Sequence, residues 1–176
     1  MKRVLIIGNC GSGKTTFART LAEKTGLRLV HLDKLFWHGN WQHVTPQEMD
    51  VLLQDELDKE SWILDGNFNR TLPRRLAYCD TVFFFDLPVL TCLIGVLKRT
   101  WQNRGKTRDD MGGFCPEYFD KNKLRLFKNI IQFNKTHRKD YGKLLENTKT
   151  ANVIRFRRRS DIRQYLITIA SSSIKE

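Results

Sequence analysis

The feature that most constrains this chain is a glycine-rich stretch near its start, GNCGSGKT at residues 8–15. It satisfies the pattern G-x-x-x-x-G-K-[ST] without a mismatch. An apolar run at 4–7 precedes it, and a segment with apolar residues at helical spacing, 16–24, follows it. Strand, glycine loop and helix in this order surround an anion with backbone N–H groups and a helix N-terminus. The stretch therefore predicts a phosphate-binding loop.

The residue types of this loop predict its ligands. Its glycines lack a Cβ, so the backbone can approach phosphate oxygens closely. Lys14 supplies an ammonium to the β- and γ-phosphates of a nucleoside triphosphate, and the Thr15 hydroxyl can ligate Mg²⁺. We therefore expect ATP and Mg²⁺ as cofactors, and we expect the nucleotide to contact Gly8, Gly11, Ser12, Gly13, Lys14, Thr15 and Thr16.

Composition sets the class of protein. A length of 176 residues suits one domain spanning 1–176, and 40% hydrophobic with 28% charged residues is typical of a soluble globular protein. The most apolar segment, 81–97, is interrupted by Asp86 and Pro88, and no signal peptide is visible, so we expect a cytoplasmic protein without a membrane partner. The four cysteines form no C-x-x-C pair, which favours reduced thiols.

Four further apolar segments that alternate with helical patterns have the character of strands. Strands are expected at 27–33, 61–66 and 81–86, and another at 151–156, which predicts a doubly wound α/β domain. The first two of these end in Asp33 and Asp65. Carboxyl ends of parallel strands border the ligand crevice, so both carboxylates are candidates for substrate or Mg²⁺. Alternatively, Asp33 simply begins a turn.

An aromatic stretch, 34–44, is the candidate acceptor region. It contains Phe36, Trp37 and Trp41, and it either folds back on the core or holds a planar ligand. Further along, Arg70 is a candidate ligand for a substrate anion. Arg74 and Arg75 could share that role or lie on a solvated helix face.

The segment 103–118 has the composition of a lid. It is rich in glycine and basic residues, which predicts a mobile flap that buries little. Arg99, Arg104 and Arg108 would project from the flap or its stem and stabilise charge on a transferring phosphoryl group. The alternative is an exposed basic loop without a role.

The last third of the chain is basic and helical in pattern. One long amphipathic helix is expected over 121–146, with an apolar face and a face of lysines and arginines. That basic face is either solvated or a nucleic-acid surface, and the net charge of +12 fits both a phosphate-handling cleft and a nucleic-acid binder. A helix at 161–170 should pack inward, and the tail at 171–176 should fray.

These segments together resemble the adenylate-kinase-like P-loop kinases, and most closely the DNA topology modulation proteins. The likeness runs through nearly the whole chain: GNCGSGKT at 8–15, HLDKLFW at 31–37, WILDGNF at 62–68, FFFDLP at 83–88, RGKTRDDMGGFCPEYFD at 104–120 and FRRRSDIRQYL at 156–166. It implies a three-layer α/β/α sandwich, the P-loop nucleoside triphosphate hydrolase fold with a lid. The sheet would have five parallel strands in the order 2-3-1-4-5.

The resemblance also implies roles for individual residues. Asp65 matches the Asp of the D-G motif that organises Mg²⁺, and Arg99, Arg104 and Arg108 match stem and lid arginines that contact ATP and the moving phosphoryl group. Arg157 would lie near the adenine. In nucleotide monophosphate kinases the D-G motif continues F-P-R, whereas here the arginine is displaced by one residue, so AMP is not assumed as the acceptor.

The predicted function is transfer of the ATP γ-phosphoryl group to a small acceptor, nucleotide-like or other. The acceptor would lie near Asp33, Phe36, Trp37, Asp65 and Arg70, and the Asp33 carboxylate could accept its proton. One alternative is a nucleic-acid-binding protein that influences DNA topology with ATP as a switch, which is less favoured because no DNA-reading motif accompanies the charge. Another is an ATPase without an acceptor.

Overall fold

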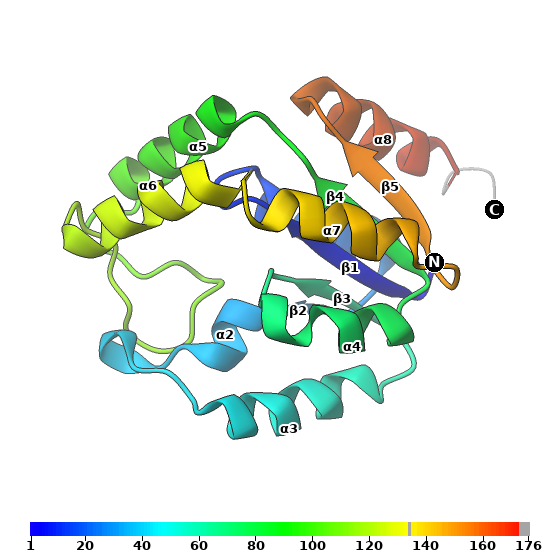
Figure 1. The fold of residues 1–176 in the computed structure, drawn as a ribbon, viewed down its shortest axis with the longest axis horizontal. Helices are drawn as coiled ribbons and strands as arrows, with labels where there is room; N and C mark the ends of the chain where they lie inside the picture. The colour runs from blue at the N-terminus through cyan, green and yellow to red at the C-terminus, as the bar shows by residue number, and fades with distance from the viewer. Residues whose placement is uncertain (134, 173–176) are drawn as a thin grey trace.

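The computed structural model describes residues 1–133 and 135–172, and a parallel sheet forms its centre (Figure 1). The strands are β1 (Arg3–Gly8), β2 (Leu29–His31), β3 (Trp62–Asp65), β4 (Thr81–Phe85) and β5 (Asn152–Phe156). All neighbours pair in parallel, in the order β2-β3-β1-β4-β5. The five-stranded sheet and its strand order are therefore confirmed.

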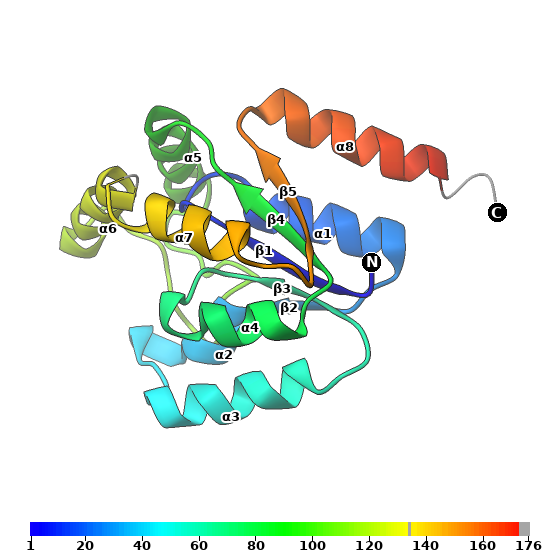
Figure 2. The ribbon, with the colours of Figure 1, turned by 45° about the vertical axis from the view of Figure 1, so that its right-hand side comes forward.

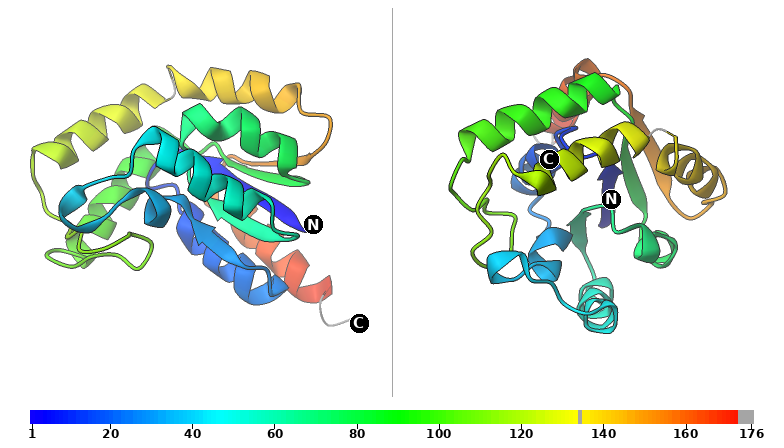
Figure 3. Two further views of the ribbon diagram at one scale, coloured as in Figure 1. Left: turned by 90° about the horizontal axis from the view of Figure 1, so that it is seen from below. Right: turned by 60° about the vertical axis from the view of Figure 1, so that its left-hand side comes forward.

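Helices cover both faces of this sheet (Figures 2 and 3). One face carries α3 (Pro46–Leu57), α4 (Leu72–Tyr78) and α7 (His137–Glu146), and the other carries α1 (Lys14–Thr25), α5 (Val89–Gln102) and α8 (Arg159–Ser172). Alternate residues of β1 serve the two sides: Leu5 and Ile7 belong to one core cluster, Val4 and Ile6 to the other. A strand buried on both faces must be apolar throughout, which explains the continuous apolar runs and confirms the three-layer sandwich.

Shorter elements follow the carboxyl ends of the strands. After β2 come α2 (Leu32–Phe36) and the 3₁₀ turn η1 (Gly39–Trp41), and the 3₁₀ turn η2 (Asn69–Thr71) leads from β3 into α4. Helix α6 (Lys121–Phe133) packs on α5. These elements surround the end of the sheet at which the glycine-rich loop lies.

The strand expected at 27–33 is shorter than predicted. Backbone pairing with β3 ends at His31, and the chain turns at once into α2, so Asp33 lies in the first helical turn rather than at a strand tip. An acidic side chain is favourable at that position because it faces the positive end of the helix dipole. The turn therefore places Asp33 beyond the carboxyl end of β2.

The prediction of one helix over 121–146 is wrong. The segment forms two helices, α6 and α7, and the backbone N–H groups of Lys135 and Thr136 both donate to the Gln132 carbonyl, at 2.8 and 3.0 Å. Both helices bury an apolar face, so the apolar pattern continues through the break. The apolar face of α6 packs on α5, whereas that of α7 covers the sheet. A single straight helix could not pack against both α5 and the sheet.

The end of the chain continues α8 through Ser172, slightly beyond the expected 161–170. The predicted fraying concerns mainly residues 173–176, which lie outside the described residues. Within the described part of the chain, no helix combines the length and the apolar character needed to cross a membrane. The four cysteines are all free thiols.

Candidate active site

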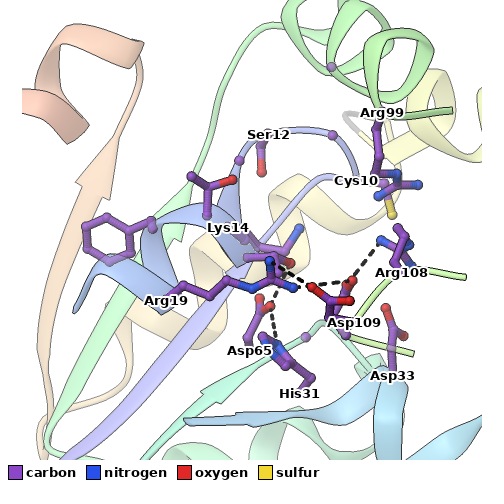
Figure 4. Close-up of a pocket in the computed structure, with 18 of the residues that line it drawn as sticks. Cys10, Ser12, Lys14, Arg19, His31, Asp33, Asp65, Arg99, Arg108 and Asp109 are labelled. Atoms are coloured by element: carbon purple, nitrogen blue, oxygen red, sulfur yellow. Dashed lines mark hydrogen bonds and ion pairs between the residues drawn. The ribbon is translucent and has the colours of Figure 1, made fainter. Parts of the chain in front are cut away.

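A cavity of about 880 Å³ opens at the carboxyl ends of the strands, beside the glycine-rich loop (Figure 4). Its walls come from parts of the chain that are far apart in sequence. They comprise the loop and the start of α1 (Cys10–Thr16), the ends of β2 and β3 (His31 and Asp65), α2 (Asp33 and Phe36), α5 (Lys98 and Arg99), the 103–118 segment (Arg108–Asp110) and α8 (Arg159 and Arg163). The topology therefore brings the predicted donor and acceptor residues to one space.

The glycine-rich loop connects β1 to α1, whose first residue is Lys14. The Lys14 ammonium donates to the Asn9 carbonyl at 2.9 Å, within the loop itself. The Ser12 hydroxyl is buried and has no hydrogen-bond partner among the described residues. A free buried hydroxyl and a mobile ammonium beside a helix N-terminus are suited to phosphate oxygens.

Asp65 and Thr15 form the candidate Mg²⁺ site. The Thr15 hydroxyl donates to Asp65 Oδ2 at 2.7 Å, and His31 Nδ1 lies 3.1 Å from the same oxygen. Asp65 Oδ1 is buried and unpartnered within the described residues. No group of three or more His, Cys, Asp or Glu residues that could cage a metal occurs in that part of the chain. These donors fit Mg²⁺, which commonly takes one or two protein oxygens together with nucleotide phosphates and water.

Asp33 faces the cavity from α2 (Figure 4). Its carboxylate makes no hydrogen bond or ion pair with any described residue. Burial raises the pKa of Asp33, while the positive charges of Arg108 and Lys14 act in the opposite direction. A carboxylate with a raised pKa, free of partners and close to a bound substrate, can accept a proton.

The 103–118 segment buries far more than predicted. Cys115 is fully buried, and Asp110, Met111 and Glu117 are at most 5% exposed. Instead of standing away from the molecule, the segment packs against η1 and the end of α2: the Asn40 N–H donates to the Phe114 carbonyl at 2.7 Å. Gly112 permits this approach, because a Cβ there would collide with the Trp37 carbonyl. The 103–118 segment and the aromatic stretch therefore lie side by side (Figures 1 and 3).

A buried carboxylate, Glu117, anchors the lid arginines. Glu117 Oε1 lies 3.2 Å from Arg108 Nε and 3.6 Å from Arg99 Nε, while the other oxygen binds the Lys123 ammonium and the Thr100 hydroxyl. Burial alone would raise the pKa of Glu117, but the three cations outweigh it and lower that pKa. The ion cluster fixes Arg99 and Arg108 at the cavity wall.

We expect Glu117→Gln to lower the free energy of unfolding by about 3–5 kcal/mol, because three partly or fully buried cations would lose their shared counter-ion. Urea unfolding of both proteins measures this difference. Glu146→Gln, which alters an exposed carboxylate at the end of α7, is the matched control and should change little. A loss below about 1 kcal/mol, the range of exposed ion pairs, would contradict the anchoring role.

Four predicted site residues, Gly8, Arg70, Arg104 and Arg157, do not line the main cavity. The Arg70 guanidinium pairs with Asp50 of α3, both contacts at 2.8 Å, and borders a separate hollow of about 200 Å³. Arg104 is exposed at the lid stem, and neither it nor Arg157 lines the main cavity. In place of Arg157, Arg159 and Arg163 of α8 contribute cations. Gly8 lies at the end of β1, where its N–H donates to Asn67.

Arg75 has neither of the two roles considered for it. Its side chain is fully buried, and its guanidinium donates to the carbonyls of Gly66, Asn67 and Phe68. Burial lowers the pKa of Arg75 to about 10, so the side chain remains charged at neutral pH. It fixes the loop after β3, where the Asn67 side chain accepts the Gly8 N–H at 3.0 Å.

Gly95 of α5 is a further residue that motif reasoning did not select. It lies directly against the glycine-rich loop, and a Cβ at this position would collide with the Gly11 carbonyl oxygen. The absent side chain lets α5 support the loop at van der Waals distance. Nothing in the sequence around Gly95 distinguishes it from other helical glycines.

Gly95→Ala is expected to displace the loop and to weaken ATP binding by about tenfold or more, since overpacking against backbone costs about 1–3 kcal/mol. Titration with an ATP analogue measures the change. Gly142→Ala on α7 is the matched control, because a Cβ there meets nothing within 4 Å. Unchanged affinity in the folded Gly95 variant would show that the loop does not depend on this contact.

Comparison with known proteins establishes the fold. No protein-family model and no curated protein matches the chain. Among solved structures, shikimate kinase from Acinetobacter baumannii in complex with shikimate is 14% identical, with a TM-score of 0.53 over 98% of this chain and 94% of that one. Shikimate kinase from Bacteroides thetaiotaomicron is 15% identical, with a TM-score of 0.57 over 97% of each chain. The chain thus has the fold of P-loop kinases, and the resemblance to DNA topology modulation proteins stays a prediction.

Proposed function

We propose that this chain is a phosphotransferase that moves the γ-phosphoryl group of ATP to a hydroxyl group of a small acceptor. The observation that carries the proposal is the position of Asp33. This unpartnered carboxylate faces the same cavity as Lys14 and Arg108, and that cavity is also lined by Thr15 and Asp65, which share a hydrogen bond. A base, an anion-binding loop and a lid arginine around one space are the parts that phosphoryl transfer needs.

In the proposed reaction, the acceptor hydroxyl oxygen forms a bond to the γ-phosphorus. The bond from that phosphorus to the β–γ bridging oxygen breaks, and ADP leaves with the electron pair. The hydroxyl proton passes to the Asp33 carboxylate. Mg²⁺, when bound, would neutralise charge on the β- and γ-phosphates, with Thr15 and Asp65 as its protein partners.

Positive charge around the donor supports the same assignment. Lys14 and Arg108 can face the transferring group from opposite sides, and Arg99 approaches the loop from α5 (Figure 4). Charge that develops on the phosphoryl oxygens is stabilised most by donors fixed before the reaction. The Glu117 cluster supplies that fixation for both arginines.

Nucleic-acid binding has weaker support. Lys123 is engaged by buried Glu117, and Arg138 pairs with buried Asp86 at 2.6 Å, so two cations of the expected basic face are internally neutralised. The sequence itself carries no recognisable DNA-reading motif. We therefore favour the enzyme.

Acceptor-dependent ADP release tests the proposal. The protein is incubated with ATP and Mg²⁺ and with a panel of sugars, polyols, nucleosides and nucleotides, and ADP is measured against an acceptor-free control. We expect at least one compound to raise the rate clearly above the control. Equal ADP release with and without every compound would identify an ATPase instead.

A further inference from the structure

We infer that the acceptor is a polyhydroxylated molecule without phosphate or carboxylate groups, bound through an apolar face. This inference rests on the proposed phosphotransferase function and concerns the acceptor end of the same cavity. It follows from the distribution of charge along the cavity wall, which differs sharply between the two ends.

The donor end is rich in unpaired positive charge. Lys14, Lys98, Arg159 and Arg163 line it, and none of them forms an ion pair with a described residue. They come from the start of α1, from α5 and from α8. Four cations without carboxylate partners suit a triphosphate, whose charge they can neutralise.

The acceptor end has the opposite character. Asp33 and Asp110 contribute carboxylates to the wall there, and they lie close enough for the Asp110 charge to raise the pKa of Asp33. The arginine beside them is already paired: Arg108 lies 3.1 Å from Asp110 and 3.2 Å from Glu117, and both carboxylates are buried. Apart from Lys14, which the triphosphate would engage, no described cation that acts on Asp33 is without a carboxylate partner.

The neighbouring arginines do not change this conclusion. Arg70 is paired with Asp50 outside the cavity, and the buried Arg75 guanidinium donates hydrogen bonds to three backbone carbonyls. An acceptor phosphate or carboxylate near Arg108 would lie against the Asp33 carboxylate and would compete with the transferring phosphoryl group for that arginine. Like charges placed in contact at a binding site weaken binding strongly.

Aromatic side chains, rather than free cations, line the cavity next to Asp33. Phe36, Trp37 and Phe68 line the cavity next to Asp33, and the Phe36 ring lies 5.0 Å from each of the other two ring centroids. Such rings pack against the C–H face of a sugar or the flat face of a nucleoside base. Asp33 then meets a hydroxyl of the same molecule.

Matched acceptor pairs test the inference. Glucose and glucosamine are compared with gluconate, and a nucleoside is compared with its 5′-monophosphate, so the two arms separate sugar from nucleoside acceptors. Binding to the wild-type protein with ADP and Mg²⁺ is followed by tryptophan fluorescence, and product formation with ATP is measured in parallel. In at least one arm we expect the uncharged or cationic member to bind about tenfold or more tightly than its anionic partner.

A variant tests the charge argument itself. Asp110→Asn removes the charge of one of the two carboxylates that pair with Arg108. It should improve binding of the anionic member by about threefold or more relative to the neutral one. If that variant does not fold, Asp33→Asn, which removes the nearest like charge, should change the same ratio in the same direction. Asp55→Asn on the exposed side of α3 is the control and should leave the ratio unchanged.

The outcomes separate the two proposals. Equal or tighter binding of the anionic members, or binding of no member of either arm by a protein that binds ATP, overturns the acceptor inference and leaves nucleotide binding intact. Failure of the wild-type protein to bind ATP overturns the phosphotransferase function itself.

Discussion

Replacing Lys14 by alanine should lower the rate of phosphoryl transfer by about 10²–10³-fold or more, since it removes a fixed positive charge from the transferring group. The ammonium donates to the Asn9 carbonyl and makes no other hydrogen bond to the residues that the structure describes, so it is free to move to the β- and γ-phosphates. The rate of ADP formation under saturating acceptor measures the effect. Weaker ATP binding should accompany it.

The control for this variant lies on the same helix. Lys24→Ala removes a lysine from the last turn of α1, outside the cavity, and should retain normal rate and affinity. Circular dichroism and thermal unfolding of both variants verify that α1 is intact. A folded Lys14→Ala protein that turns over ATP normally would contradict the assignment of the loop as the donor site.

Asp33→Asn should lower kcat by about 10²–10⁴-fold while leaving ATP affinity nearly unchanged, because the amide cannot accept the acceptor proton. The two measurements, kcat and the dissociation constant for an ATP analogue, separate proton transfer from nucleotide binding. The matched control is Asp55→Asn, an exposed carboxylate of α3. Comparable loss in both variants would show that the effect is not specific to the cavity.

The pH profile gives Asp33 a second signature. Burial raises its pKa, and only the ionised form can accept a proton, so kcat should fall as pH decreases through an apparent pKa above the usual aspartate value of about 3.9. The free energy of unfolding should depend on pH in the opposite direction: because the pKa of Asp33 is raised in the folded protein, its contribution to stability falls as pH rises. A raised pKa means that the folded state favours the protonated form, so Asp33→Asn should not destabilise the protein at neutral pH, where the wild type must bury a charge. Marked destabilisation by Asn would contradict this.

Local signals explain why much of the fold was predictable. The apolar runs that became β1 and β4 reflect burial on both faces, and the glycine-rich loop between a strand and a helix is specific in both residue type and spacing. The end of β2 was less predictable. Pairing with β3, not the residues themselves, decides that the strand stops at His31 and that Asp33 lies on a helix.

Tertiary contacts explain what the sequence could not predict. Glu117 gathers Arg99, Arg108 and Lys123 only because the lid folds back between α5 and α6, and its position in the chain gives no sign of this. Gly112 indicated flexibility but serves close packing against Trp37. Likewise, the burial of Arg75 depends on the backbone path after β3.

The fate of the γ-phosphorus tests the central claim most directly. Phosphorus NMR can follow ATP, Mg²⁺, the protein and a mixture of sugars, aminosugars and nucleosides through the reaction. We predict that the γ-phosphorus signal is replaced by that of a phosphomonoester, in step with ADP, and that Lys14→Ala abolishes this change. Conversion of the γ-phosphorus to inorganic phosphate alone, at the same rate with or without the mixture, would contradict the assignment of this cavity as a phosphotransferase site.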